Sequence, residues 1–156
     1  SSISTILIYL ILILIGAKYM TGKPTLDTNI LIYAFGRKDD TRKQVAKEII
    51  TKCNIISLQV VNETVYVLLK KLKFQLPEVD TVIQFMKQKF VICDLNMAIL
   101  DQTLKITALY GFSFWDSMIL ASALNNNCSV LYSEDFQHLQ IIESRLQIIN
   151  PFTNLP

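Results

Sequence analysis

Short apolar runs alternate with longer amphipathic segments from residue 20 onward. Short, continuously apolar runs are typical of parallel strands that are buried on both faces. Such runs predict strands at residues 24–26, 55–57, 91–93, 130–132 and 146–149. Apolar positions at helical spacing predict helices at residues 29–35, 41–52, 59–72, 77–90, 97–110 and 114–125. The chain therefore alternates between strands and helices along its whole domain.

This alternation predicts the fold class. Consecutive strands that are joined through helices need crossover connections, and these produce a parallel sheet with helices on both faces. We expect an α/β fold of three layers, with a central parallel sheet of about five strands. The carboxyl ends of parallel strands share one edge, and ligands bind there, where the strand order reverses. Acidic residues at strand ends therefore carry the most information about function.

Residues 1–19 differ from the rest of the chain. No charged residue occurs from Ser1 to Ala17, and Ile, Leu and Tyr dominate this stretch. The run is short for a membrane-spanning helix, which needs about 20 apolar residues, and it lacks the charged start and cleavage site of a secretory signal. We interpret residues 1–19 as a leader outside the domain and residues 20–156 as the domain. A membrane anchor and an integral strand or helix remain alternatives for the leader.

Composition supports a single folded domain. The chain has 156 residues, of which 51% are hydrophobic and 18% are charged, and this excludes disordered and fibrous proteins. The net charge of +2 is too small to identify a partner, because clustered acids would mask a basic binding surface. Cys53, Cys93 and Cys128 lie far apart without metal-ligand spacing, which favours small buried side chains in a reducing cytoplasm.

Four acidic residues stand near predicted strand-to-helix junctions or helix starts. Asp27 follows the first strand, Glu63 lies in the second turn of the helix after the second strand, and Asp135 follows the fourth strand. Asp116 lies in the first turn of the helix at residues 114–125. Clustered carboxylates repel one another unless they are protonated or bind a cation, and Mg²⁺ prefers such oxygen ligands. This arrangement suits metal-dependent hydrolysis of a phosphodiester without a catalytic histidine.

Each acid also has a purely structural interpretation. Asp27 could cap the short helix that follows it, and Asp116 could complete a capping box at the start of its helix. Glu63 could be an ordinary acid beside an apolar helix stripe. Asp135 could cap a short helix, and Glu134 could then replace it as the metal ligand. The joint placement of the four acids, rather than any one of them, favours a metal site.

Other catalytic and binding signals are weaker. His138 is the single histidine and lacks partners for a Ser-His-Asp triad or a zinc site, so we expect a surface or turn role for it. The four glycines form neither a phosphate-binding loop nor a dinucleotide fingerprint. We expect Trp115 to pack in the core, with stacking on a base as the alternative. Basic residues that could contact RNA phosphates, or form only a solvated face, are Arg37, Lys38, Lys70 and Lys71.

Four segments resemble the motifs of the PIN-domain family. Residues 26–34, which read LDTNILIYA, look like the opening motif with its first acid, and VVNE at residues 60–63 matches the second acid. The segment FWDSMI at residues 114–119 resembles the part of the family that carries the third acid. YSEDFQH at residues 132–138 is similar to the C-terminal signature of a subgroup of VapC-type toxins. The resemblance covers residues 23–152, and four acids in this order are fairly specific.

The resemblance implies a PIN-like fold and a ribonuclease of the VapC type. The acids that it implies as catalytic ligands of Mg²⁺ or Mn²⁺ are Asp27, Glu63, Asp116 and Asp135. Asn29 and Ser133 would orient these acids through hydrogen bonds. The resemblance further implies a homodimer and a small cognate antitoxin that blocks the site. One position departs from the subgroup, because Leu139 stands where glycine is usual, and this concerns the local turn rather than the acids.

We therefore predict a cytoplasmic endoribonuclease that depends on Mg²⁺ or Mn²⁺, cleaves RNA and acts as the toxin of a type II toxin–antitoxin system. One alternative is a PIN-like module that binds RNA or a protein without catalysis, which the presence of all four acids disfavours. The other is a metal-dependent DNA nuclease, for which the short helices leave little room. Association with a membrane would depend on residues 1–19.

Overall fold

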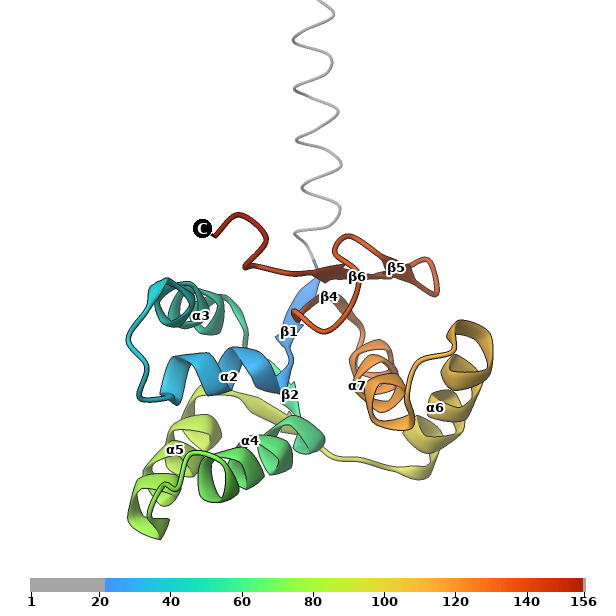
Figure 1. Cartoon of the computed structure of the whole chain (residues 1–156). Coiled ribbons are helices and arrows are strands. Elements are labelled where there is room, and N and C mark those ends of the chain that lie inside the picture. Colours follow the sequence, from blue (N-terminus) through green and yellow to red (C-terminus); the bar gives the residue numbers. More distant parts are fainter. Residues whose placement is uncertain (1–21, 156) are drawn as a thin grey trace, which may run out of the picture.

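The computed structural model describes residues 22–155, so the apolar leader at residues 1–19 lies outside the described part of the chain. Helices and strands alternate as the sequence pattern predicts (Figure 1). Their bounds are β1 Lys23–Leu26, α2 Thr28–Phe35, α3 Thr41–Lys52, β2 Ile55–Ser57, α4 Leu58–Lys70, α5 Leu76–Lys89, β3 Val91–Cys93, α6 Met97–Tyr110, α7 Phe114–Asn125, β4 Cys128–Tyr132, β5 Ile141–Ile142 and β6 Leu146–Ile149. No helix within residues 22–155 is long and apolar enough to cross a membrane.

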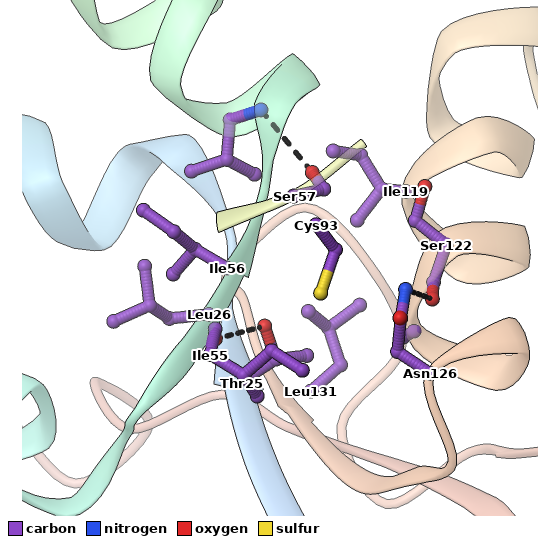
Figure 2. Close-up of a pocket in the computed structure, with 12 residues that line it drawn as sticks. Thr25, Leu26, Ile55, Ile56, Ser57, Cys93, Ile119, Ser122, Asn126 and Leu131 are labelled. Carbon is purple, nitrogen blue, oxygen red and sulfur yellow. Dashed lines mark hydrogen bonds between the residues drawn. The ribbon is translucent and has the colours of Figure 1, made fainter. Parts of the chain in front are cut away.

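The strands form a sheet in the order β1-β4-β6-β5, beside a parallel pair of β2 and β3. The β1, β4 and β6 strands are mutually parallel, and Leu26 at the end of β1 pairs with Tyr132 at the end of β4. The pair packs next to β1, where the Thr25 hydroxyl donates to the Ile55 carbonyl at 2.8 Å (Figure 2). The predicted α/β fold with a central parallel sheet is therefore confirmed.

The chain winds in two directions from β1. It first adds β2 and β3 on one side, and it then returns to place β4 on the other side of β1. Because crossovers have a fixed hand, connections that run in opposite directions put their helices on opposite faces. Helices α2 to α5 accordingly lie on one side of the strands, and α6 and α7 lie on the other (Figure 1). The strand order reverses between β1 and β4, which is where α/β folds bind ligands.

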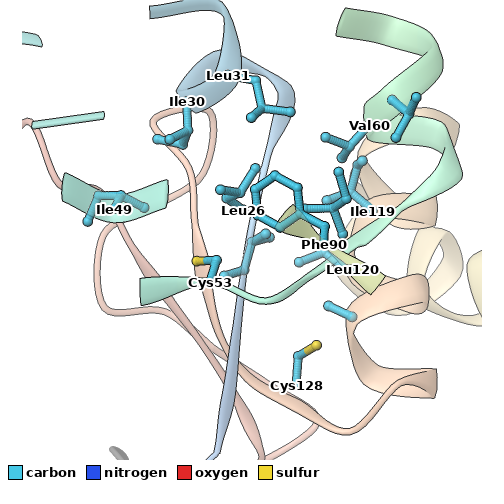
Figure 3. Packing of buried hydrophobic residues seen from close by; sticks show 14 of the residues in the cluster. Leu26, Ile30, Leu31, Ile49, Cys53, Val60, Phe90, Ile119, Leu120 and Cys128 are labelled. Carbon is cyan, nitrogen blue, oxygen red and sulfur yellow. The ribbon is translucent and has the colours of Figure 1, made fainter. Parts of the chain in front are cut away.

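The core fills the space between these layers. Helix α7 is its centre, since every residue from Ser117 to Leu124 is buried. Its buried residues belong to the same core cluster as residues of β1, α2 and α4, and Figure 3 shows Ile119 of α7 with Leu26, Leu31 and Val60 of this cluster. Cys53 and Cys128 are buried within the same cluster, and Cys93 is partly buried, as expected of small apolar side chains. A deep apolar core of this kind fixes the strand ends relative to the helices.

The antiparallel strand β5 departs from the predicted pattern. It has two residues, Ile141 and Ile142, and pairs with β6 through a turn in which Glu143 and Ser144 have φ of 51° and 56°. Positive φ at both central positions is the geometry of a type I′ turn, for which Asn-Gly is the usual signal. The Glu-Ser sequence lacks that signal, so the hairpin could not be predicted from it.

Two other positions adopt the left-handed backbone conformation at functionally informative places. Gly111 ends α6 as its C-cap with φ of 72°, a conformation that glycine adopts without steric strain. Leu139 has φ of 67°, so this chain keeps the backbone of a glycine position with a leucine. The backbone at Leu139 is therefore in a conformation that suits the glycine usual in the toxin-like signature.

Candidate active site

An open cleft of about 1130 Å³ lies at the carboxyl ends of β1 and β4. Its walls come from α2, from α4 along its length to Leu72, from the start of α7, from Leu95 after β3 and from the loop after β4. The four predicted acids, Asp27, Glu63, Asp116 and Asp135, all line it. None of them lines the small enclosed pocket that lies between β2 and α7 in Figure 2. The fold thus brings acids from four distant segments to one surface.

Asp27 is the most buried of the four acids, with 5% of its surface exposed. One carboxylate oxygen accepts from the Thr28 backbone N–H at 2.7 Å, and the other accepts from the Ser133 hydroxyl at 2.8 Å. Burial raises the pKa of Asp27 from 3.8 to about 7, against these two hydrogen bonds, and the nearby charges of Asp135 and Glu63 add to the rise. A cation beside the carboxyl would favour its charged form.

Both carboxylate oxygens of Glu63 are held by neighbouring side chains. The Thr28 hydroxyl donates to Oε2 at 2.8 Å, and Gln59 Nε2 donates to Oε1 at 2.9 Å. Thr28 is the first residue of α2, whereas Gln59 lies one turn before Glu63 on α4. These bonds fix the Glu63 carboxylate beside the strand end that carries Asp27. An ordinary acid beside the apolar stripe of α4 would not need two hydrogen-bond donors to hold its carboxylate in place.

The loop after β4 presents two acids in different ways. Asp135 is exposed, and its Oδ2 accepts from Asn29 Nδ2 at 3.0 Å. Ser133 is fully buried, and its hydroxyl accepts from the Asp135 backbone N–H at 3.1 Å while it donates to Asp27. Glu134 also lines the cleft, and it accepts from the Tyr33 hydroxyl at 2.7 Å. Asn29 and Ser133 therefore connect Asp135 to the strand end.

Asp116 combines a capping position with a place in the cleft. Its backbone N–H donates to the Ser113 hydroxyl at 3.2 Å, which is the cap that the sequence predicts for α7. Burial raises the pKa of Asp116, and the charges of Asp135 and Glu63 act in the same direction. A side-chain hydrogen bond from Ser113 to the Asp116 carboxyl lowers this pKa and opposes the rise. The cap and the facing acids are compatible, because the helix N-terminus points into the cleft.

The donor set fits a hard divalent cation, although the side chains are not gathered tightly. Within residues 22–155, no three His, Cys, Asp or Glu side chains stand close enough together to hold an ion on their own. Mg²⁺ usually takes only one or two carboxylates and completes its shell with water and substrate phosphate. The raised pKa of Asp27 and of Asp116 shows that negative charge is costly in this cleft. A bound cation would remove that cost.

The basic residues that the sequence offers as RNA contacts occupy different environments. Arg37 donates to the Leu72 carbonyl at 2.6 Å and to Glu78 at 3.0 Å, so its guanidinium is already engaged. Lys38 lies 3.4 Å from Asp40. Lys71 lines the cleft, and neither Lys71 nor its exposed neighbour Lys70 forms a salt bridge with any residue in the range 22–155.

Trp115 corrects a prediction from the sequence. It does not pack in the core, because 61% of its surface is exposed and it lines the cleft next to Asp116. The buried face of α7 begins only at Ser117, so the first turn of the helix projects beyond the core. His138 does have the expected turn role, since its Nδ1 accepts from the Asn150 backbone N–H at 3.0 Å.

Sequence reasoning missed two partners of Glu63 and one of Glu134, namely Thr28, Gln59 and Tyr33. Gln59 and Glu63 are four residues apart in a predicted helix, and this spacing could have predicted the contact between their side chains. The contact between Gln59 and α7 has no such signal, because Nε2 also donates at 3.0 Å to the carbonyl of Trp115, 56 residues away. Tyr33 and Glu134 are likewise distant in sequence.

Known proteins with a similar sequence pattern or structure have the same type of fold as this chain. The family model of the PIN domain matches residues 25–143, and no curated protein matches the chain. A toxin–antitoxin complex from Klebsiella pneumoniae is similar in structure, with a TM-score of 0.62, 22% identity, and coverage of 83% of this chain and 97% of that one.

Two further solved structures have the same fold. One is VapC20 of Mycobacterium tuberculosis, described as a sarcin-ricin loop cleaving toxin, with a TM-score of 0.61, 16% identity, and coverage of 79% of this chain and 99% of that one. The other is VapBC2 from Rickettsia felis bound to a promoter DNA fragment, with a TM-score of 0.57, 19% identity, and coverage of 80% and 96%. At these identities the likeness concerns the fold.

Proposed function

Because the chain belongs to the PIN-domain family, we propose that it is an endoribonuclease that depends on Mg²⁺ or Mn²⁺ and acts as the toxin of a toxin–antitoxin pair. The observation that carries this proposal is the meeting of four acids from distant segments in one cleft, beside the point where the strand order reverses. We place the protein in the cytoplasm, where its free cysteines would stay reduced.

The residues that would hold the cation are Asp27, Glu63, Asp116 and Asp135. When bound, the ion supplies positive charge that offsets the charge of a phosphodiester and favours ionisation of a water molecule. Asp27 and Glu63 would contribute oriented carboxylates, since hydrogen bonds from neighbouring groups fix both oxygens of each. Asn29 would orient Asp135 through the bond of 3.0 Å between them. Preorganised acids need little rearrangement when the substrate arrives.

Single-stranded RNA suits the surroundings of the acids. Trp115 is exposed at the rim beside Asp116, and an exposed aromatic ring can stack on an unpaired base. Lys71 lies in the same cleft, and Lys70 is exposed next to it, so both can contact backbone phosphates. Arg37 and Lys38 would contribute less, because they already contact Glu78 and Asp40.

A small antitoxin suits the same cleft when RNA is absent. Apolar side chains form much of its wall, and Tyr66, Leu95 and Trp115 among them are exposed. An antitoxin segment with an apolar face would cover this wall, and an Arg or Lys side chain from it would pair with the acids. We further expect the toxin to be a homodimer, as the family resemblance implies.

Two measurements test this proposal. The purified protein should cleave single-stranded RNA with Mg²⁺ or Mn²⁺ and leave DNA of the same sequence intact. Cleavage of DNA instead of RNA would favour the alternative of a DNA nuclease, and tight binding of RNA without cleavage would favour a binding module. Expression of the chain should arrest growth, and co-expression of a small protein encoded beside it should relieve the arrest. A chain that is harmless at high expression would contradict the toxin assignment.

A further inference from the structure

Gln59 occupies a buried position between two of the acid-bearing helices. It is the second residue of α4, and 3% of its surface is exposed. Its Nε2 donates to Glu63 Oε1 at 2.9 Å and to the Trp115 carbonyl at 3.0 Å. The Trp115 carbonyl belongs to the first turn of α7, one residue before Asp116. A single amide group therefore links the Glu63 carboxylate to the backbone that carries Asp116.

The orientation of this amide follows from its partners. A carboxylate oxygen and a backbone carbonyl both accept hydrogen bonds and cannot donate them, so the NH₂ group must face them. Gln59 Oε1 then points the other way, and it is buried without a hydrogen-bond partner among the described residues. A buried acceptor without a partner destabilises the folded protein, because it has lost its hydrogen bonds to water. An apolar side chain of similar length would avoid this cost, so packing alone does not account for glutamine here.

The bonds of Glu63 complete the link. Its second oxygen accepts from the Thr28 hydroxyl, next to Asp27, at 2.8 Å. Hydrogen bonds thus run from the start of α2, through Glu63 and Gln59, to the start of α7. Loss of the Gln59 amide would leave one oxygen of Glu63 without its donor. It would also remove the hydrogen bond that joins α4 to the first turn of α7.

We propose that Gln59 is a positioning residue that sets the separation and direction of Glu63 and Asp116 for binding of a divalent cation. This inference rests on the proposed metal-dependent function, and it adds a residue that acts through two of the acids. Hydrogen bonds behind metal ligands typically change metal affinity by about 10- to 100-fold when they are removed. The same range is expected for Gln59.

The chain offers a matched control on α5. Gln84 Nε2 donates to Asp80 Oδ1 at 3.4 Å, again across four residues of a helix, but this pair is exposed and neither residue lines the cleft. Gln59→Met and Gln84→Met remove the same kind of bond with the same near-isosteric side chain. Gln59→Asn keeps the amide but shortens its reach by one methylene, and it serves where the methionine variant fails to fold.

The experiment measures Mn²⁺ binding by titration calorimetry and records backbone amide NMR signals of the metal-free proteins. Gln59→Met should raise the Kd for Mn²⁺ about 10- to 100-fold, whereas Gln84→Met should leave it within about twofold. In the absence of metal, Gln59→Met should shift the amide signals of both Glu63 and Asp116. RNA cleavage should lose kcat by a similar factor, with little change in KM.

Three results would overturn the inference. They are an unchanged Kd for Mn²⁺ in Gln59→Met, equal losses in Gln59→Met and Gln84→Met, and amide shifts that do not reach Asp116. A wild-type protein that binds Mn²⁺ but cleaves no RNA would contradict the proposed function alone, because the Kd and the amide signals would still test Gln59. A wild-type protein that binds no Mn²⁺ would contradict both.

Discussion

Asp27→Asn should stabilise the metal-free protein at neutral and alkaline pH. Burial raises the pKa of Asp27 from 3.8 to about 7, so the folded protein holds a proton that the unfolded chain has already released. The contribution of Asp27 to the free energy of unfolding is therefore greatest below about pH 4, falls as the pH rises towards 7, and changes little above that value. The asparagine side chain resembles the protonated acid in shape and charge, and it does not titrate in this range.

The magnitude follows from the gap between the two pKa values. From 3.8 to about 7 is roughly 3 pH units, and each unit corresponds to about 1.4 kcal/mol. As the pH rises from about 4 to about 7, the free energy of unfolding of the wild type should fall by up to about 4 kcal/mol relative to that of the variant. Even a quarter of this value would raise the melting temperature of the variant by roughly 2–4 °C.

The assay is thermal or urea unfolding of both proteins in EDTA at several pH values from 4 to 8. Equal stabilities near pH 4 and a more stable variant at pH 8 are expected. Addition of Mn²⁺ at pH 8 should reverse the order, since the cation stabilises the charged acid of the wild type by mass action. A variant that is less stable than the wild type at pH 8 in EDTA, or a difference that is independent of pH, would refute the reasoning.

Three other predictions use the same protein. Affinity of the wild type for Mn²⁺ should rise with pH up to about 7 and then level off, as calorimetry can test, because the cation competes with the proton of Asp27; a flat profile would argue against Asp27 as a ligand. Lys71→Ala should raise the KM for RNA and lower by about 1 the slope of the logarithm of the binding constant against the logarithm of salt concentration. The control Lys105→Ala on α6 should change neither quantity, and equal effects of the two variants would contradict a contact between Lys71 and RNA. Leu139→Gly should raise stability by up to about 1 kcal/mol in unfolding experiments, since a left-handed leucine costs about 1–2 kcal/mol and glycine entropy returns part of it; a large loss would show that the leucine side chain is required.

The sequence predicted those parts of the fold and site that depend on local pattern. Strand ends and helix starts follow from apolar runs and caps, and acids at such places share one edge of a parallel sheet. Asp27 and Asp135 illustrate this, because the register that pairs Leu26 with Tyr132 brings their segments together. Ser113 as the cap of α7 was predictable for the same reason.

Contacts between distant segments were beyond the local pattern. The bond from Gln59 to the Trp115 carbonyl depends on how α4 and α7 pack, and no spacing in the sequence encodes it. The exposure of Trp115 could not be predicted for the same reason. Its apolar ring suggests burial, and only the packing of α7 shows that the first turn of this helix projects beyond the core. The turn at Glu143 and Ser144 uses residues that do not favour its conformation, so tertiary context decides it.

The cleavage rate of a defined RNA by the purified protein tests the central claim most directly. The wild type, the double variant Asp27→Asn/Asp116→Asn and the control Asp101→Asn, which changes an exposed acid on α6, would each be measured with Mg²⁺, Mn²⁺ or EDTA. A single metal-dependent cleft predicts that the wild type and the control cleave RNA only with a divalent cation, and that the double variant is inactive under every condition while it remains folded. Cleavage that survives EDTA, or that survives the loss of Asp27 and Asp116 together, would contradict the account.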